Sequence, residues 1–95
     1  MSLSCVQLDL SGNNLDPESA KALAPALAAS ASVTDLNLYN NSLKDEGVTT
    51  ICKAVQSNKE TKLASLNVGN NRMGPAGAKS VAATVAVIPS LTSVR

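Results

Sequence analysis

The chain contains no histidine, phenylalanine or tryptophan, and Tyr39 is its only aromatic residue. Without histidine, neither the usual nucleophile–base pairs nor a zinc site of the usual ligands can be assembled. Hydrophobic residues still make up 44% of the chain, so the core must consist of leucine, valine, isoleucine and many alanines. We therefore expect no catalytic site, no metal and no cofactor.

An excess of charge of one sign is also missing. Eight basic and seven acidic residues leave a net charge of +1, which offers no electrostatic attraction to nucleic acid or to an anionic membrane. No apolar run approaches the about 20 residues of a membrane span, and residues 1–10 lack the features of a signal peptide. Cys5 and Cys52 are too few for a disulfide framework, and two buried free thiols agree with a reducing compartment. These absences predict a cytoplasmic protein that binds neither nucleic acid nor membrane.

What the chain does contain is one recurring pattern. The segments CVQLDLSGNNL (5–15), VTDLNLYNNSL (33–43) and LASLNVGNNRM (63–73) superimpose without a gap, with their first residues 28 and 30 positions apart. All three fit the pattern L-x-x-L-x-L-x-x-N-x-L with apolar exchanges. The segment LTSVR opens a fourth copy after a further 28 positions. The pattern predicts one domain over residues 1–95, with repeats at about 5–32, 33–62 and 63–90 and a fourth strand at 91–95.

This pattern resembles the leucine-rich repeats of the long, ribonuclease-inhibitor-like class. Proteins built from such repeats include NOD-like receptors, tropomodulin-type actin cappers and Ran GTPase-activating proteins. The resemblance covers essentially the whole chain from Cys5 onward. It implies an α/β solenoid, an open horseshoe fragment with a parallel sheet on the concave face and helices on the convex face.

Residue spacing alone leads to the same architecture. Leu36 and Leu38 alternate with polar residues, as in a half-buried strand, and each copy continues into a helical segment with an apolar stripe. The predicted stripes are Ala20, Leu23, Ala24 and Leu27, then Val48, Ile51, Cys52 and Val55, then Ala78, Val81, Ala82 and Val85. Asp16 and Asp45 are expected to cap the first and second helices, whereas Pro25 predicts a kink or an early end. Strand, helix and strand in so short a repeat predict parallel strands.

One asparagine recurs at the same place in each copy, as Asn13, Asn41 and Asn71. The chain turns inward there, and the backbone groups of a tight, partly buried loop need hydrogen-bond partners. An asparagine amide offers both a donor and an acceptor. We therefore predict a structural ladder in which each amide bridges its own loop to the next. The companions Asn14, Asn40 and Asn70 are predicted to be ordinary turn residues.

The polar strand positions form the candidate binding surface, because they point away from the core. The predicted contact residues are Gln7, Asp9, Asp35, Asn37, Tyr39, Asn67 and Arg95. The column neighbours of Tyr39 are Ser11 and Gly69, which should leave its ring standing clear. Tyrosine and arginine are favoured anchors of protein interfaces. The sequence thus predicts a non-enzymatic interaction module that binds a protein partner through the concave face.

Three other functions stay open. Asp9 and Asp35 would lie roughly 8 Å apart on adjacent strands, which overlaps the carboxylate separation of an inverting glycosidase, but nothing near them would raise a pKa. Neither end of the solenoid shows a polar cap, which favours a fragment of a larger repeat protein or self-association through the ends. Regulation of a small GTPase would follow from fold analogy alone.

Overall fold

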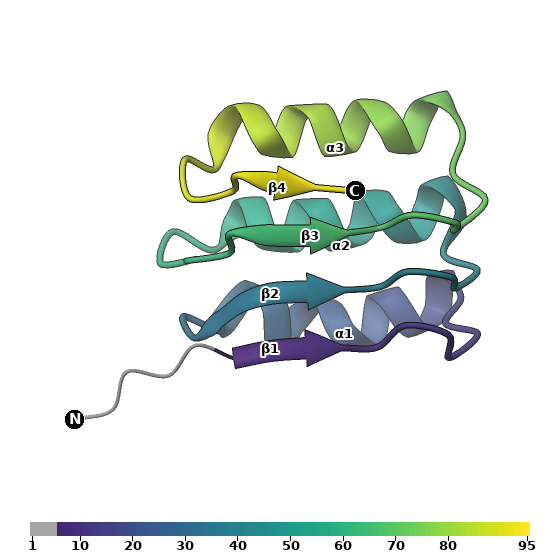
Figure 1. The fold of residues 1–95 in the computed structure, drawn as a ribbon, viewed down its shortest axis with the longest axis horizontal. Coiled ribbons are helices and arrows are strands. Elements are labelled where there is room, and N and C mark those ends of the chain that lie inside the picture. Colours follow the sequence, from purple (N-terminus) through teal and green to yellow (C-terminus); the bar gives the residue numbers. More distant parts are fainter. Residues whose placement is uncertain (1–5) are drawn as a thin grey trace.

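Strands and helices alternate along residues 6–95, the part of the chain that the computed structural model describes (Figure 1). The strands are β1 (Val6–Asp9), β2 (Val33–Asn37), β3 (Ser65–Asn67) and β4 (Ser93–Val94). The helices are α1 (Pro17–Ala29), α2 (Lys44–Ser57) and α3 (Pro75–Val87). This order confirms the predicted strand and helix of each copy. Cys5, at the first position of the pattern, lies outside the described residues.

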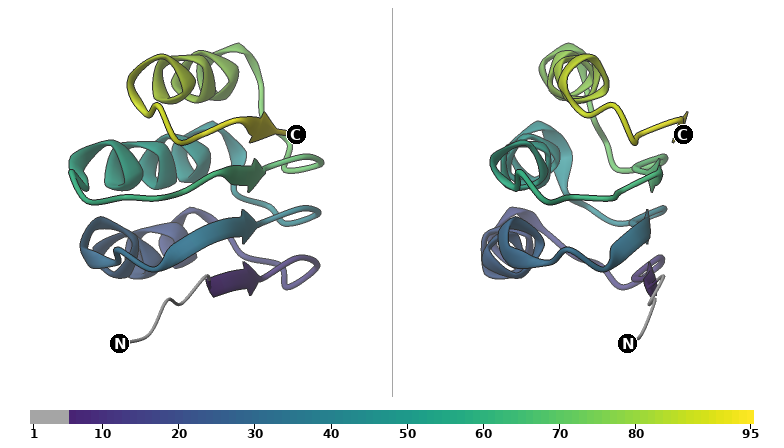
Figure 2. Two further views of the ribbon diagram at one scale, coloured as in Figure 1. Left: turned by 60° about the vertical axis from the view of Figure 1, so that its left-hand side comes forward. Right: turned by 90° about the vertical axis from the view of Figure 1, so that its left-hand side faces the viewer.

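The four strands form one sheet in chain order, β1-β2-β3-β4, and every neighbouring pair is parallel. Leu8 lies opposite Leu36, Leu36 opposite Leu66, and Leu66 opposite Val94. The register therefore reproduces the superposition of the repeats, including the fourth strand. The helices cover one side of the sheet and leave the other side uncovered, which we call the open face (Figure 2). The predicted α/β solenoid with a parallel sheet is confirmed.

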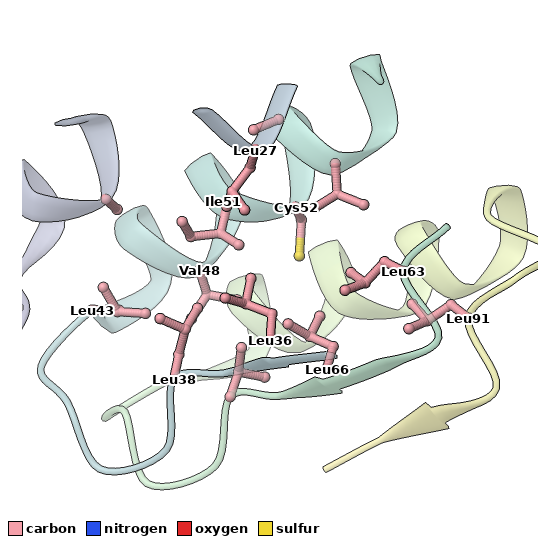
Figure 3. Packing of buried hydrophobic residues seen from close by; sticks show 14 of the residues in the cluster. Leu27, Leu36, Leu38, Leu43, Val48, Ile51, Cys52, Leu63, Leu66 and Leu91 are labelled. Atoms are coloured by element: carbon pink, nitrogen blue, oxygen red, sulfur yellow. The ribbon is translucent and has the colours of Figure 1, made fainter. Parts of the chain in front are cut away.

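The hydrophobic core lies between the sheet and the helices (Figure 3). Its largest fully buried aliphatic side chains come from the second and third repeats: Leu36, Leu38, Leu43, Val48, Ile51, Leu63, Leu66 and Val68. Helix α2 buries six residues, whereas α1 and α3 bury two each, because only α2 has a helix packed on either side. Cys52 belongs to this core, and burial raises the pKa of its thiol, which disfavours a reactive thiolate.

Helix α3 buries a different stripe from the predicted one. Ala78, Ala82 and Val85 are exposed, whereas Gly77 and Thr84 are buried. Among the described residues α2 is the one helix that packs closely against α3. Its buried stripe is therefore turned toward the preceding helix, and the prediction from helical spacing is wrong for these three residues.

Helix α1 follows its sequence signals at the start but not at Pro25. Asp16 is the N-cap, and its Oδ1 accepts a hydrogen bond from the Ser19 N–H at 2.9 Å, as predicted. Pro25 lies inside the helix, which continues to Ala29, so an early end is wrong. The proline ring is exposed on the outer surface, where the helix accommodates it at the cost of one internal hydrogen bond.

Asp45 does not cap its own helix, contrary to the prediction. The N-cap of α2 is Leu43, which makes no side-chain capping bond. Oδ1 of Asp45 instead accepts hydrogen bonds from the N–H groups of Gly74 at 2.7 Å and Gly77 at 2.9 Å, at the start of α3. The carboxylate thus satisfies unpaired N–H groups of the neighbouring helix and places its negative charge at the positive end of that helix.

Asp45→Ala is expected to lower the free energy of unfolding by about 1–2 kcal/mol, as for the loss of an N-cap. Urea unfolding of the purified domain measures the change. Glu46→Ala is the matched control, because Glu46 carries the same charge in the same first turn but is exposed and caps no neighbouring helix. Its cost is expected to stay within about 0.5 kcal/mol. Equal losses for the two variants would contradict the capping role across repeats.

Candidate functional site

Two rows of polar residues cross the open face of the sheet in register. The first row is Gln7, Asp35, Ser65 and Ser93, and the second is Asp9, Asn37, Asn67 and Arg95. Arg95 continues the second row because its N–H donates to the Leu66 carbonyl at 2.9 Å and its carbonyl accepts from the Val68 N–H at 2.8 Å. Since the intervening residues Leu36 and Leu66 are buried, the row residues point away from the core. The structure therefore brings the predicted contact residues of the strands onto one face.

The second row also has a structural task that the sequence pattern did not reveal. Asp9, Asn37 and Asn67 each accept a hydrogen bond at 3.0 Å from the N–H two residues ahead, which belongs to Ser11, Tyr39 and Gly69 respectively. Asp and Asn side chains often accept a hydrogen bond from the backbone N–H two residues ahead, and this tendency could have predicted these contacts from the sequence. One oxygen of each side chain is thus engaged in ending its strand, and the rest of each side chain faces solvent.

Asp9 is exposed to solvent and Asp35 is half-buried, and neither has a cationic partner within residues 6–95. The Ser11 hydroxyl donates to Asp9 at 2.6 Å, and this bond together with the Ser11 N–H lowers the pKa of Asp9 below its usual value. Asp35 accepts a bond from the Gln7 amide at 3.4 Å. Among residues 6–95 the one ion pair joins Lys21 to Glu18 on α1. A glycosidase acid needs a raised pKa, so the geometry gives the pair Asp9 and Asp35 no support as a catalytic site.

Tyr39 follows β2 and is 47% exposed. Its ring lies against Gly69, where an added Cβ would come within 3.2 Å of the tyrosine Cδ1. The expectation that the ring stands clear of both column neighbours is therefore wrong on the Gly69 side. Because one side of the ring is seated on the next repeat, less rotamer freedom remains to be lost when the exposed side contacts another molecule.

Asn41 is buried and bridges two successive loops. Its Oδ1 accepts hydrogen bonds from the N–H groups of Asn13 at 2.9 Å and Leu15 at 3.0 Å. Its Nδ2 donates to the carbonyls of Leu10 and Leu38, both at 3.0 Å. Three of these four partners belong to the first repeat, so the amide holds the preceding loop.

Asn71 repeats this arrangement one repeat further along. It is 1% exposed, and its Nδ2 donates to the carbonyls of Leu38 at 2.8 Å and Val68 at 3.0 Å. Its Oδ1 accepts from the Leu43 N–H at 3.3 Å. Asn13 is exposed, and its amide bonds only carbonyls of its own loop among the described residues. The bridges therefore run to the preceding loop, not to the following one.

Comparison with known proteins agrees with this geometry. Residues 4–24, 29–52 and 59–82 match the family model described as Leucine Rich repeat. The chain belongs to the leucine-rich repeat family, and its repeats are of the ribonuclease-inhibitor-like class.

A curated relative supports the same class. The chain is 35% identical over 78 residues to RAN GTPase-activating protein 2 of Arabidopsis thaliana. The matched stretch is 82% of this chain but only 14% of that relative, so the chain spans a small part of the protein it matches.

Within residues 6–95, no helix combines the length and apolar character needed to cross a membrane, and the same residues contain no cluster of His, Cys, Asp and Glu suited to a metal ion.

Proposed function

We propose that this chain is a non-enzymatic protein-interaction module that holds a protein partner on the open face, the concave side of the solenoid. The observation that carries the proposal is Tyr39, a half-exposed aromatic seated on Gly69 next to the second row of polar groups on the open face. A tyrosine in such a setting is a favoured interface anchor. The proposed contact residues are Tyr39, Asp9, Asp35, Asn37, Asn67, Gln7 and Arg95.

The charges of the open face favour one polarity of partner. Asp9 and Asp35 lie on β1 and β2, whereas Arg95 directly follows β4. Three strand spacings separate Asp9 from Arg95, or about 14 Å. A partner with a basic group over the two carboxylates and an acidic group over Arg95 would be complementary. The remaining row residues are neutral and polar, which favours a hydrated contact.

Tyr39→Ala is expected to raise the Kd for the partner at least about tenfold, as for a central tyrosine anchor, and to leave thermal unfolding nearly unchanged. The partner is first identified by placing a photo-crosslinking amino acid at position 39 and recovering the adducts from a cell lysate. The same amino acid at position 79, on the exposed surface of α3, defines the background.

Binding of the recovered partner is then measured with purified wild type, Tyr39→Ala and the control Lys79→Ala. The control is expected to bind like the wild type. An unchanged Kd for Tyr39→Ala would remove this residue from the proposed contact.

A second candidate function, regulation of a small GTPase, is favoured by the likeness to RAN GTPase-activating protein 2. It is a regulatory activity toward a protein partner and is compatible with the same surface. Adding the purified chain to purified RAN loaded with GTP provides the test. Accelerated release of phosphate would support this function, and an unchanged rate would exclude it for this chain.

We also propose a cytoplasmic location, on the low cysteine content and the balanced charge of the sequence.

Self-association is the alternative role. Its support is the exposure of Val94 on the outer strand β4, at 37%, and of Val85 and Val87 on α3, at 43% and 58%, since an uncovered strand edge can pair with another chain. Light scattering that gives a monomer at high concentration would exclude this role.

A further inference from the structure

A polar hollow of about 300 Å³ lies where the loops that follow β1, β2 and β3 run one above another. These loops form the right-hand edge of the molecule in Figure 1. The lining consists of Arg72 and the four asparagines Asn14, Asn40, Asn41 and Asn70, together with a serine and a glycine. None of these residues belongs to the two polar rows of the open face. The hollow is therefore a separate candidate site.

Within the part of the chain that the structure describes, Arg72 is the only ionisable residue that lines the hollow. Among residues 6–95 the single ion pair is that of Lys21 with Glu18, so the Arg72 guanidinium has no anionic partner there. Because no carboxylate contributes to the lining, the hollow attracts negative charge. A guanidinium also offers paired donors that match two oxygens of one anion.

Amide groups add further free donors. Nδ2 of Asn70 donates to Oδ1 of Asn40 at 2.8 Å, which turns the Nδ2 group of Asn40 away from that bond. Neither this group nor the amide of Asn14 has an acceptor among the described residues. The amide of Asn41 is fully used in bridging the loops and forms a fixed boundary of the hollow. The lining thus combines one cation with two unpaired amide donors.

The backbone of these loops is held in an unusual conformation. Asn14, Asn40, Asn70 and Arg72 have φ angles of 54°, 60°, 54° and 58°, in the left-handed region that few residues other than glycine adopt. Asparagine tolerates this region, but arginine has no short side chain to compensate locally. Asn14 occupies the same repeat position as Arg72. An arginine at position 72 therefore carries a conformational cost that asparagine would largely avoid. Such a cost is typical of functional sites, and we infer that the arginine side chain has a role that offsets it.

We propose that the hollow binds an oxyanion, the phosphate or carboxylate group of a ligand, through the Arg72 guanidinium and the amide Nδ2 groups of Asn14 and Asn40. Its volume of about 300 Å³ is at the lower limit of ligand pockets, which suits a single small group. The Asn41 amide ties two of these loops together and so keeps the backbone that carries the donors in place before binding, which reduces the ordering needed when the anion arrives.

Titration of ¹⁵N-labelled protein with inorganic phosphate, and separately with acetate, tests this site by NMR. Sodium chloride keeps the ionic strength constant. Saturable shifts are expected for the side-chain NH₂ signals of Asn14 and Asn40 and for the Nε–H of Arg72. Saturation with phosphate alone identifies a phosphate site, whereas saturation with acetate identifies a carboxylate site. No saturable shift with either anion overturns the proposal.

Arg72→Asn is the decisive variant, because asparagine suits the positive φ while the guanidinium, with its charge and its donors, is lost. It is expected to weaken anion binding by about tenfold or more, as for the loss of a charge-assisted hydrogen bond. Lys79→Gln removes one positive charge from the exposed surface of α3 and is expected to leave binding unchanged. Unfolding in urea establishes that both variants are folded. Equal weakening by both variants, or full binding by Arg72→Asn, overturns the proposal.

Discussion

Asn71→Ala is expected to lower the free energy of unfolding by about 3–5 kcal/mol, because two buried backbone groups would lose their partners at about 1–3 kcal/mol each and a third would lose one of two bonds. The Val68 carbonyl would lose its donor and the Leu43 N–H its acceptor, whereas the Leu38 carbonyl would keep only its bond from Asn41. At 1% exposure, the site gives water little access to replace them. A loss of this size is a large share of the stability of a small domain.

Asn13→Ala provides the matched control, since Asn13 has the same repeat position and the same substitution but is exposed. Its amide bonds the carbonyls of Leu10 and Ser11 within its own loop, where water can replace it, and the expected cost is below about 1 kcal/mol. Urea unfolding followed by circular dichroism measures both variants. Similar costs at the two positions would show that bridging between loops contributes little.

Leu36→Ala is expected to cost about 2–5 kcal/mol, the range for a fully buried leucine truncated in a packed core. Leu36 is 1% exposed and lies on β2 between the neighbouring leucines of β1 and β3. The second repeat is covered on both sides, so its core has little freedom to collapse around the missing atoms. Unfolding in urea measures the loss.

Leu8→Ala is the corresponding control on β1. Leu8 is the direct register partner of Leu36 but is only half-buried, so the same truncation removes less buried area and is expected to cost about 1–2 kcal/mol. A cost at Leu8 equal to that at Leu36 would contradict the view that the second repeat provides most of the core.

Much of the open face could be predicted from the sequence. Alternation in the strands places Asp35, Asn37 and Tyr39 on the same side, because the strand period of two is a property of the backbone itself. The engagement of Asn37 with the Tyr39 N–H and the seating of Tyr39 on Gly69 could not be predicted in the same way. Both depend on side-chain rotamers and on the spacing of adjacent repeats, which a linear pattern does not contain.

The amino-acid sequence by itself determined the repeat, the parallel order of the strands and the position of the asparagines that turn the chain inward. These features follow from local periodicity and from backbone groups that need partners wherever the chain turns. Only the tertiary structure decided that Asp45 caps α3, that α3 buries Gly77 and Thr84, and that Arg72 lines a hollow with asparagines of earlier repeats. Each of these contacts joins residues about one repeat apart or more, and stacking of the repeats brings together groups that local spacing leaves unassigned.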